Sequence, residues 1–485
     1  MGLRKSWLVA ATAMLVATGG CDMAGGGNGT AAAGVTSEAL QAAAQDADVR
    51  RFYEARQWQA AWTQESGEQL VETIRGAVRH GINPSALLRD IEAAGSPAER
   101  EAALTKAALS YAGSLAHGVT NPERLTQVYE VPRNQVDLVR GLAGAVEQNN
   151  AAQWIEAQAP QDEEYRALSA AYMQLVQARQ QQQQQPQQQS AGAAQQNAQG
   201  NAQAETKADN DDERRTNANQ LPPEDRAVIL AVNMERRRWL ERQAAGTRID
   251  VNTAAAFLRY FRDGNLADQR VVVVGEPGWE TPQLGSPIFR LVANPTWTVP
   301  DSIEQDELAR LSPAQLARRN MTRENGRLVQ QPGPQNALGL VKFDMENDHA
   351  IYLHDTPAKQ MFGRDDRHLS HGCVRVQDAL GFARLLAQHE GKLDQFERAQ
   401  RRDTRQAGAE IEPTYINLER RIPVRLLYHT AYFSNGQVTF APDSYGWDAA
   451  VAEGLGLRAP GASSEALERA RQKRAARQRG ADFGP

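Results

Sequence analysis

Apolar residues recur along this chain with two different periods, and the change of period divides it into a helical part and a mainly β part. Across residues 38–178 they follow helical spacing, most clearly in the segments 70–78 and 104–115. We interpret three tryptophans on these stripes as core residues: Trp58, Trp62 and Trp154. The pattern predicts an α-helical N-terminal domain without catalytic residues.

A helix is also predicted from Pro222 to Trp239, and after it short apolar runs bounded by turn residues replace the helical period. These runs predict strands at 257–262, 270–274, 288–293, 351–353, 424–433 and 437–440. Asp263-Gly264 and Ser434-Asn435-Gly436 are typical of hairpin turns. The predicted fold class is α+β, with a mainly β domain over residues 221–458.

Three segments stand apart from these two domains. Residues 179–220 are rich in Gln, Ala and Asn, and we interpret them as a disordered linker whose first residues prolong the preceding helix. Residues 301–337 form an insertion with a helical piece at 308–319, either a lid or a passive surface loop. The charged tail 459–485 contains a helix candidate at 463–479, either a solvated face or a surface attracted to anionic lipid or wall polymer.

The N-terminus is typical of an export signal. Positive residues at 4 and 5, an apolar run over 7–16 and a small-residue approach to Cys21 resemble a bacterial lipoprotein signal spanning residues 1–21. Lipidation of Cys21 and simple cleavage nearby both remain open, and both export the protein. Residues 22–37 would then form a flexible tether to a membrane.

Charge and cysteine content narrow the function. The 54 Lys and Arg against 59 Asp and Glu give a net charge of −5, which disfavours nucleic-acid binding. Only two cysteines occur, Cys21 and Cys373. In an oxidising compartment, a thiol without a disulfide partner is prone to unwanted oxidation, which makes it costly unless the thiol has a function. We therefore favour a reactive Cys373 over a buried inert one.

The surroundings of Cys373 contain the components of thiol catalysis. His354 lies 19 positions upstream and His371 two positions upstream, and either imidazole can serve as the base that a thiol needs. Gly372 permits a sharp turn in which the amides of residues 372 and 373 face an oxyanion. A helix predicted to begin at 377–380 and run to Gln388 would favour a thiolate if its positive end pointed at the sulfur.

Metal binding is the rival use of this region, because it concentrates several possible ligands: His349, His354, His368, His371 and Cys373. The spacing matches no established zinc motif. We therefore favour a cysteine acyl-transfer site without a metal or other cofactor, and interpret His349 and His368 as solvent-facing or packing residues.

Residues 354–375 resemble the catalytic signature of the L,D-transpeptidases, the YkuD-like enzymes that cross-link peptidoglycan. Further segments match the large Gram-negative subgroup with an N-terminal helical scaffold domain: Asn233-Met234-Glu235-Arg236, Val274-Gly275-Glu276-Pro277-Gly278, Asn294-Pro295-Thr296-Trp297, Val299-Pro300, residues 331–341 and Asp443-Ser444-Tyr445-Gly446. The helical region matches through Phe52-Tyr53 and residues 80–84. The pattern of the small peptidoglycan-binding module usual in this subgroup is not found.

The resemblance implies a 3→3 cross-linking reaction. Cys373 would attack the carbonyl of the third residue of a tetrapeptide stem, D-alanine would leave, and an amine of a second stem would attack the thioester. His354 would be the general base, oriented by the backbone carbonyl of Asp355. Gly372 would belong to the oxyanion hole, and His371 would be auxiliary.

The remaining expected site residues bind substrate: Arg375, Ser370, Tyr352 and Asn336. For Arg375, which would hold a carboxylate, a surface salt bridge is the alternative. The insertion would cap the donor stem. Expected partners are peptidoglycan stems, cell-wall synthases, a D,D-carboxypeptidase that supplies tetrapeptides, and a membrane reached through the lipid anchor, in a Gram-negative periplasm.

Other acceptors would give other activities at the same cysteine. Water gives an L,D-carboxypeptidase, a free D-amino acid gives exchange, and a lysine of an envelope protein gives anchoring to the wall. An idle wall-binding scaffold is the non-enzymatic alternative.

Overall fold

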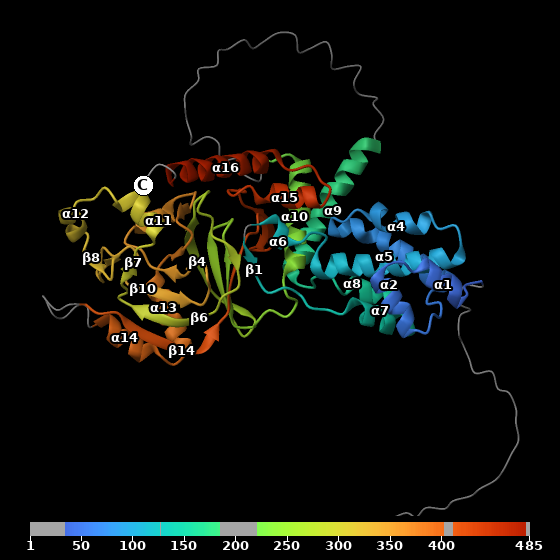
Figure 1. Cartoon of the computed structure of the whole chain (residues 1–485), viewed down its shortest axis with the longest axis horizontal. Coiled ribbons are helices and arrows are strands. Elements are labelled where there is room, and N and C mark those ends of the chain that lie inside the picture. The colour runs from blue at the N-terminus through green and yellow to red at the C-terminus, as the bar shows by residue number, and fades with distance from the viewer. Residues whose placement is uncertain (1–33, 127, 185–220, 402–410, 482–485) are drawn as a thin grey trace, which may run out of the picture.

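The computed structural model describes residues 34–126, 128–184, 221–401 and 411–481. A helical domain and a mainly β domain lie side by side, the first in blue to green and the second in yellow-green to red (Figure 1). The α+β fold class predicted from the sequence is thereby confirmed. The predicted export signal, Cys21 and most of the tether lie outside the described residues, as does most of the Gln-rich segment.

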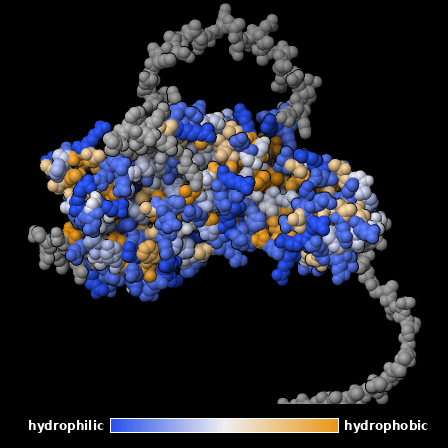
Figure 2. Space-filling model, viewed as in Figure 1, coloured by the Kyte–Doolittle hydropathy of each residue, from blue (hydrophilic) through white to orange (hydrophobic). Residues whose placement is uncertain are grey.

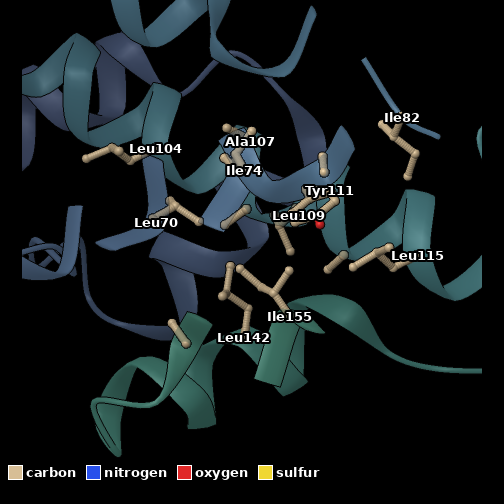
Figure 3. Close-up of a cluster of buried hydrophobic side chains, with 14 of the residues drawn as sticks. Leu70, Ile74, Ile82, Leu104, Ala107, Leu109, Tyr111, Leu115, Leu142 and Ile155 are labelled. Carbon is tan, nitrogen blue, oxygen red and sulfur yellow. The ribbon is translucent and has the colours of Figure 1, made fainter. Parts of the chain in front are cut away.

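The helical domain is built around α5 (Pro97–His117), which starts at a capping box between Ser96 and Glu99. The other elements of this region are α1 (Ser37–Ala43), α2 (Ala47–Ala55), α3 (Gln64–Arg75), η1 (Gly76–His80), α4 (Pro84–Glu92), α6 (Pro122–Leu125), β1 (Tyr129–Glu130), α7 (Leu138–Glu147), α8 (Ala151–Glu156) and α9 (Glu163–Gln184). Side chains such as Ile74, Leu142 and Ile155 meet around α5 in one apolar core (Figure 3). The three tryptophans predicted as core residues do pack here: Trp62 is buried and Trp58 and Trp154 are partly buried, but Trp58 and Trp62 lie between α2 and α3 and not on a helix.

Helix α10 (Pro223–Trp239) joins the two domains, although it follows the Gln-rich segment in sequence. Its Ile229 and Leu230 belong to the core of the helical domain. Further along the helix, Asn233 Nδ2 donates to Thr430 Oγ1 at 2.8 Å, and the Arg236 guanidinium pairs with Asp448. The helix therefore fixes the helical domain to the C-terminal part of the β domain.

The β domain is organised around one mixed sheet. Its strands lie in the order β14 (Thr414–Ile422), β6 (Ile288–Ala293), β10 (Val341–Met345), β11 (Leu353–His354), β13 (Val374–Val376), β4 (Asn265–Gly275), β3 (Phe257–Arg262), β2 (Arg248–Asn252) and β15 (Val424–Leu427), with β12 (His368–Ser370) beside β4. The helices α13 (Ala379–His389) and α14 (Leu393–Arg401) bury Phe382, Leu386 and Phe396 against this sheet. The sheet thus provides a rigid, covered base for the turns at its strand ends.

The insertion folds as a small cap with its own apolar cluster. It contains α11 (Asp301–Ile303), η3 (Glu304–Leu308), α12 (Pro313–Arg318), β8 (Met321–Glu324) and β9 (Arg327–Gln330), and β7 (Trp297–Thr298), just before the insertion, joins the same cap. The three strands form a separate sheet in the order β7-β9-β8. The helical piece predicted at 308–319 is wrong at its start, because Ser312 caps a new helix at Pro313.

Several other sequence predictions can be compared with the structure directly. The strand at 288–293, the helix to Trp239 and the helix that follows residue 377 are confirmed. The strand predicted at 351–353 is shifted to Leu353–His354. The single strand predicted at 424–433 is wrong, because the backbone leaves the sheet after Leu427, where Asn252 and Asn233 bind the amides of His429 and Thr430.

The C-terminal elements complete the fold. They are the hairpin of β16 (Ala431–Ser434) and β17 (Gln437–Phe440), α15 (Trp447–Gly454) and α16 (Gly461–Ala481), the last of which contains the predicted tail helix. Polar residues cover most of the surface seen in Figure 2, with apolar atoms scattered among them. No helix in the described ranges is both long and apolar enough to cross a membrane.

Candidate active site

Of the two residues expected to carry the chemistry, His354 ends one strand and Cys373 directly precedes the neighbouring strand. Strands β11 and β13 pair in parallel, with Leu353 opposite Val374 and His354 opposite Arg375. Cys373 immediately precedes β13, and its side chain and that of His354 line one cavity of about 800 Å³. Residues 19 positions apart in sequence are thus brought to one surface by the register of the sheet.

The turn before Cys373 is fixed by local hydrogen bonds. Gly372 has a φ of +109°, which a side chain would strain. Ser370 Oγ donates to the Cys373 carbonyl at 2.6 Å and accepts the Gly372 N–H at 3.3 Å. Because the Gly372 amide is engaged in this way, the Cys373 amide is the better placed of the two for an oxyanion.

His354 is buried and held in one tautomer. Its Nδ1 lies 2.5 Å from the Asp355 carbonyl, and since a carbonyl only accepts, Nδ1 carries the proton and Nε2 keeps its lone pair. Burial, and next the charge of Arg375, lower the pKa of His354 to about 3, against the opposing hydrogen bond to Asp355. The imidazole is therefore neutral, as a general base must be.

Cys373 is partly buried and protonated at rest. Its Sγ donates to the Ala350 carbonyl at 3.6 Å, and Ala350 has a φ of +55°. Burial raises the pKa of the Cys373 thiol, while the Tyr352 backbone N–H and the charge of Lys342 act in the opposite direction. The resting pair is thus a thiol and a neutral imidazole rather than an ion pair.

Tyr352 contacts both His354 and Cys373. Its ring packs edge to face on His354 at 5.7 Å, and the Lys342 ammonium lies 4.1 Å from its centroid. Burial, and next the neighbouring Cys373, raise the pKa of Tyr352 well above its usual range, so the phenol stays neutral. Lys342, not identified from the sequence, adds a cation behind this ring, where its ammonium pairs with Asp344 at 2.8 Å.

The other expected residues divide into two groups. Ser370, His371 and Arg375 line the cavity with Cys373. The His371 ring packs against Trp279 at 5.4 Å, and Arg375 Nη1 lies 2.9 Å from Met361 Sδ. All three thus lie at the cavity, although the Ser370 hydroxyl is itself bound by the backbone of the turn.

Asn336 is not brought to the cavity. It is 1% exposed, and its amide donates to the carbonyls of Pro295, Gln330 and Gln331 at 3.0–3.2 Å. Its Oδ1 accepts the Leu338 N–H at 2.8 Å. The residue ties the base of the cap to the loop that follows it, and its neighbours reach the cavity in its place.

The histidines considered as metal ligands have separate partners. His349 Nε2 lies 2.8 Å from Glu130 of the helical domain, and His368 contacts Asp366 at 2.8 Å and the Thr253 carbonyl at 3.0 Å. Within the described ranges, no group of three or more His, Cys, Asp or Glu residues is placed to hold a metal ion.

The cap supplies the opposite wall of the cavity. Its apolar lining comes from Trp297, Ile303, Leu308 and Met321, and its charged lining from Arg319 and Arg327. Trp297 lies in a segment that the sequence had marked through Asn294-Pro295-Thr296-Trp297. The two arginines follow no recognisable pattern, and only the fold shows that they face the site.

Comparison with known proteins agrees with this geometry. Residues 246–393 match the family model of the L,D-transpeptidase catalytic domain, and residues 47–172 match that of a scaffold domain. A putative L,D-transpeptidase of Haemophilus influenzae is 32% identical over 242 residues, which are 45% of this chain and 48% of that protein. The chain thus spans about half the length of this curated relative.

Solved structures give weaker matches. A mutant of the Enterococcus faecium L,D-transpeptidase is 12% identical at a TM-score of 0.19, over 30% of this chain and 47% of that one. The L,D-transpeptidase from Mycobacterium smegmatis is 12% identical at a TM-score of 0.21, over 38% of this chain and 60% of that one.

Proposed function

The chain carries an L,D-transpeptidase catalytic domain together with a scaffold domain, and from this premise we propose that it forms 3→3 cross-links between peptidoglycan stems. One observation supports the proposal most strongly. A neutral imidazole with a free Nε2 lone pair and a thiol line the same cavity, the first at the end of β11 and the second directly before its partner strand β13. This is the arrangement that covalent acyl transfer by cysteine requires.

In the first half of the reaction the thiol becomes the nucleophile as it attacks. Cys373 Sγ forms a bond to the carbonyl carbon of the third residue of a tetrapeptide stem, and its proton passes to His354 Nε2. The carbonyl oxygen gains the negative charge and faces the Cys373 N–H. When the intermediate collapses, His354 returns the proton to the departing amine of D-alanine, which leaves a thioester.

In the second half the thioester transfers the acyl group. The side-chain amine of the third residue of another stem attacks the thioester carbonyl and loses a proton to His354. The carbon–sulfur bond breaks, and Cys373 recovers the proton. The products are an amide that joins two third residues and the resting thiol, so no cofactor is consumed.

The surrounding residues would bind and orient the substrate. The Asp355 carbonyl keeps His354 Nδ1 protonated, so that the unprotonated Nε2 is the nitrogen available to accept the thiol proton. Arg375 supplies a cation for a stem carboxylate, and Tyr352 supplies an aromatic wall. The cap would cover the donor stem and exclude water from the thioester.

The proposal places the protein outside the cytoplasm. The apolar N-terminal segment and Cys21 support export with a lipid anchor, and the required tetrapeptides imply a D,D-carboxypeptidase and cell-wall synthases in the same compartment. The scaffold domain is large enough to bind such partners.

Mass spectrometry of muropeptides tests the function. Wild-type protein incubated with disaccharide tetrapeptide should release D-alanine and form a 3→3 dimer, whereas Cys373→Ala should do neither while its thermal unfolding stays unchanged. A tripeptide product alone would indicate hydrolysis, and D-alanine replaced by an added D-amino acid would indicate exchange. Full activity of Cys373→Ala would refute the proposal.

A further inference from the structure

A fully buried threonine lies directly behind the turn that carries Cys373. Thr281 stands between β4 and β5 (Gln283–Leu284) and is 0% exposed. Its Oγ1 donates to the Gly372 carbonyl at 2.7 Å and accepts the Gly275 N–H at 2.9 Å. One hydroxyl therefore joins the end of a central strand to the glycine before the nucleophile.

A buried tyrosine completes the same network from the C-terminal segment. Tyr445 donates its hydroxyl to the Gly275 carbonyl at 2.6 Å and accepts the Thr281 N–H at 3.3 Å. Its own amide donates to Tyr428 at 3.0 Å, and the two rings stack at 5.0 Å. Burial raises the pKa of Tyr445, so that its hydroxyl remains a donor. Gly275 thus has both of its backbone polar groups bound by Thr281 and Tyr445.

The geometry of a peptide bond gives this network a consequence for catalysis. The Gly372 carbonyl and the Cys373 N–H belong to one planar peptide group and point in opposite directions. A hydrogen bond that fixes the carbonyl also fixes where the N–H points. Gly372, with a φ of +109°, has the conformational freedom to rotate this plane, so an external restraint is needed.

We propose that Thr281, supported by Tyr445, is a positioning residue that aims the Cys373 amide at the oxyanion. The inference rests on the proposed acyl transfer, because an oxyanion develops only when the thiol attacks a carbonyl. Neither residue lines the cavity, so they act through the Gly372–Cys373 peptide and not on the substrate. The network would be unnecessary for a thiol that merely reacts with alkylating reagents.

Two reactions of the same cysteine separate positioning from general structural support. Acylation by the disaccharide tetrapeptide passes through an oxyanion, whereas alkylation by iodoacetamide displaces iodide at a saturated carbon and forms none. Thr281→Val keeps the shape but removes the hydroxyl. Loss of a direct oxyanion donor costs about 10²-fold or more in rate, and we expect loss of its restraint to cost about tenfold.

The expected result is that T281V slows kcat for acylation about tenfold, with KM and the alkylation rate within about twofold of wild type. Thr281→Ser, which restores the hydroxyl, should return acylation to within about threefold. Tyr445→Phe, one step further from the turn, should slow acylation about threefold and provides the test if T281V does not fold.

A buried threonine in the helical domain provides the matched control. Thr105 is 0% exposed and accepts hydrogen bonds from Trp62 at 2.8 Å, far from the cavity in sequence and fold. Thr105→Val should lower stability without changing the ratio of acylation to alkylation. Wild-type acylation in T281V, or an equal slowing of both reactions, would overturn the inference. A wild-type protein that is alkylated but never acylated would instead overturn the proposed function, and this inference with it.

Discussion

Both domains of this protein bury histidines, and His80 of the helical domain and His354 of the β domain have opposite surroundings. In the helical domain, His80 places Nδ1 3.0 Å from the Tyr165 hydroxyl and Nε2 3.2 Å from Glu156. In His354 of the β domain, the Asp355 carbonyl binds Nδ1, and Nε2 keeps its lone pair. Burial lowers the pKa of both rings. The comparison shows that a buried imidazole is a candidate base when one of its ring nitrogens has no hydrogen-bond partner.

The same contrast extends to the groups around each ring. Glu156 also binds the Tyr111 hydroxyl at 3.0 Å and pairs with Arg79, so the polar groups of the helical cluster satisfy one another. Around His354 the thiol has weaker partners: it lies 3.6 Å from the Ala350 carbonyl and is also contacted by Tyr352. We interpret the first cluster as a structural one and the second as a reactive one.

Replacing the free nitrogen should have the largest effect. His354→Gln removes the proton acceptor, and acylation of Cys373 by tetrapeptide should fall about 10²- to 10⁴-fold, the usual contribution of a general base. The measurement is the rate of adduct formation followed by intact-protein mass. His80→Gln is the matched variant, and it should leave that rate unchanged. Equal losses in both variants would abolish the distinction between the two histidines.

Breaking the helical cluster should affect stability instead. Although burial opposes it, hydrogen bonds from His80 and Arg79 lower the pKa of Glu156, so the carboxylate is bound in its charged form. Glu156→Gln leaves these donors with a weaker acceptor and should cost about 2 kcal/mol. Urea unfolding measures this loss. Unchanged stability combined with lost acylation would show that the cluster serves the active site.

The cap should contribute to binding rather than to the chemical step. Arg319 and Arg327 line the cavity opposite Cys373, and replacing either with alanine should raise KM for the tetrapeptide about three- to tenfold with kcat nearly unchanged. Steady-state kinetics separates the two parameters. A fall in kcat at constant KM would assign the cap to the transition state.

The smallest expected change is in the dependence of rate on pH. The pKa of His354 is lowered from 6.5 to about 3, so the neutral base persists and acylation should vary less than about twofold between about pH 5 and 8. Stability should behave differently. In the unfolded chain His354 binds a proton below about pH 6.5, whereas in the folded chain it does so only near pH 3. The free energy of unfolding therefore falls as the pH falls from about 6.5 to about 3. Thermal unfolding and acylation rates measured on the same samples test both.

The sequence predicted those features whose signals are local. The spacing of apolar residues predicted the helical domain and strand β6, and Gly372 predicted the sharp turn before Cys373. Thr281 was missed because one threonine carries no pattern, and its partners Gly372 and Tyr445 lie 91 and 164 positions away. The strand predicted at 424–433 failed for a similar reason, since the residue that binds the Thr430 amide, Asn233, is 197 positions earlier. Contacts of this separation become visible only in the folded chain.

The most direct test of the account is the intact mass of the wild-type protein shortly after it meets disaccharide tetrapeptide. The account predicts an adduct of the substrate minus D-alanine, located at Cys373 by peptide mapping and absent in His354→Gln at the same time point. A protein that alkylates at Cys373 but carries no such adduct, with or without an acceptor stem, would contradict it.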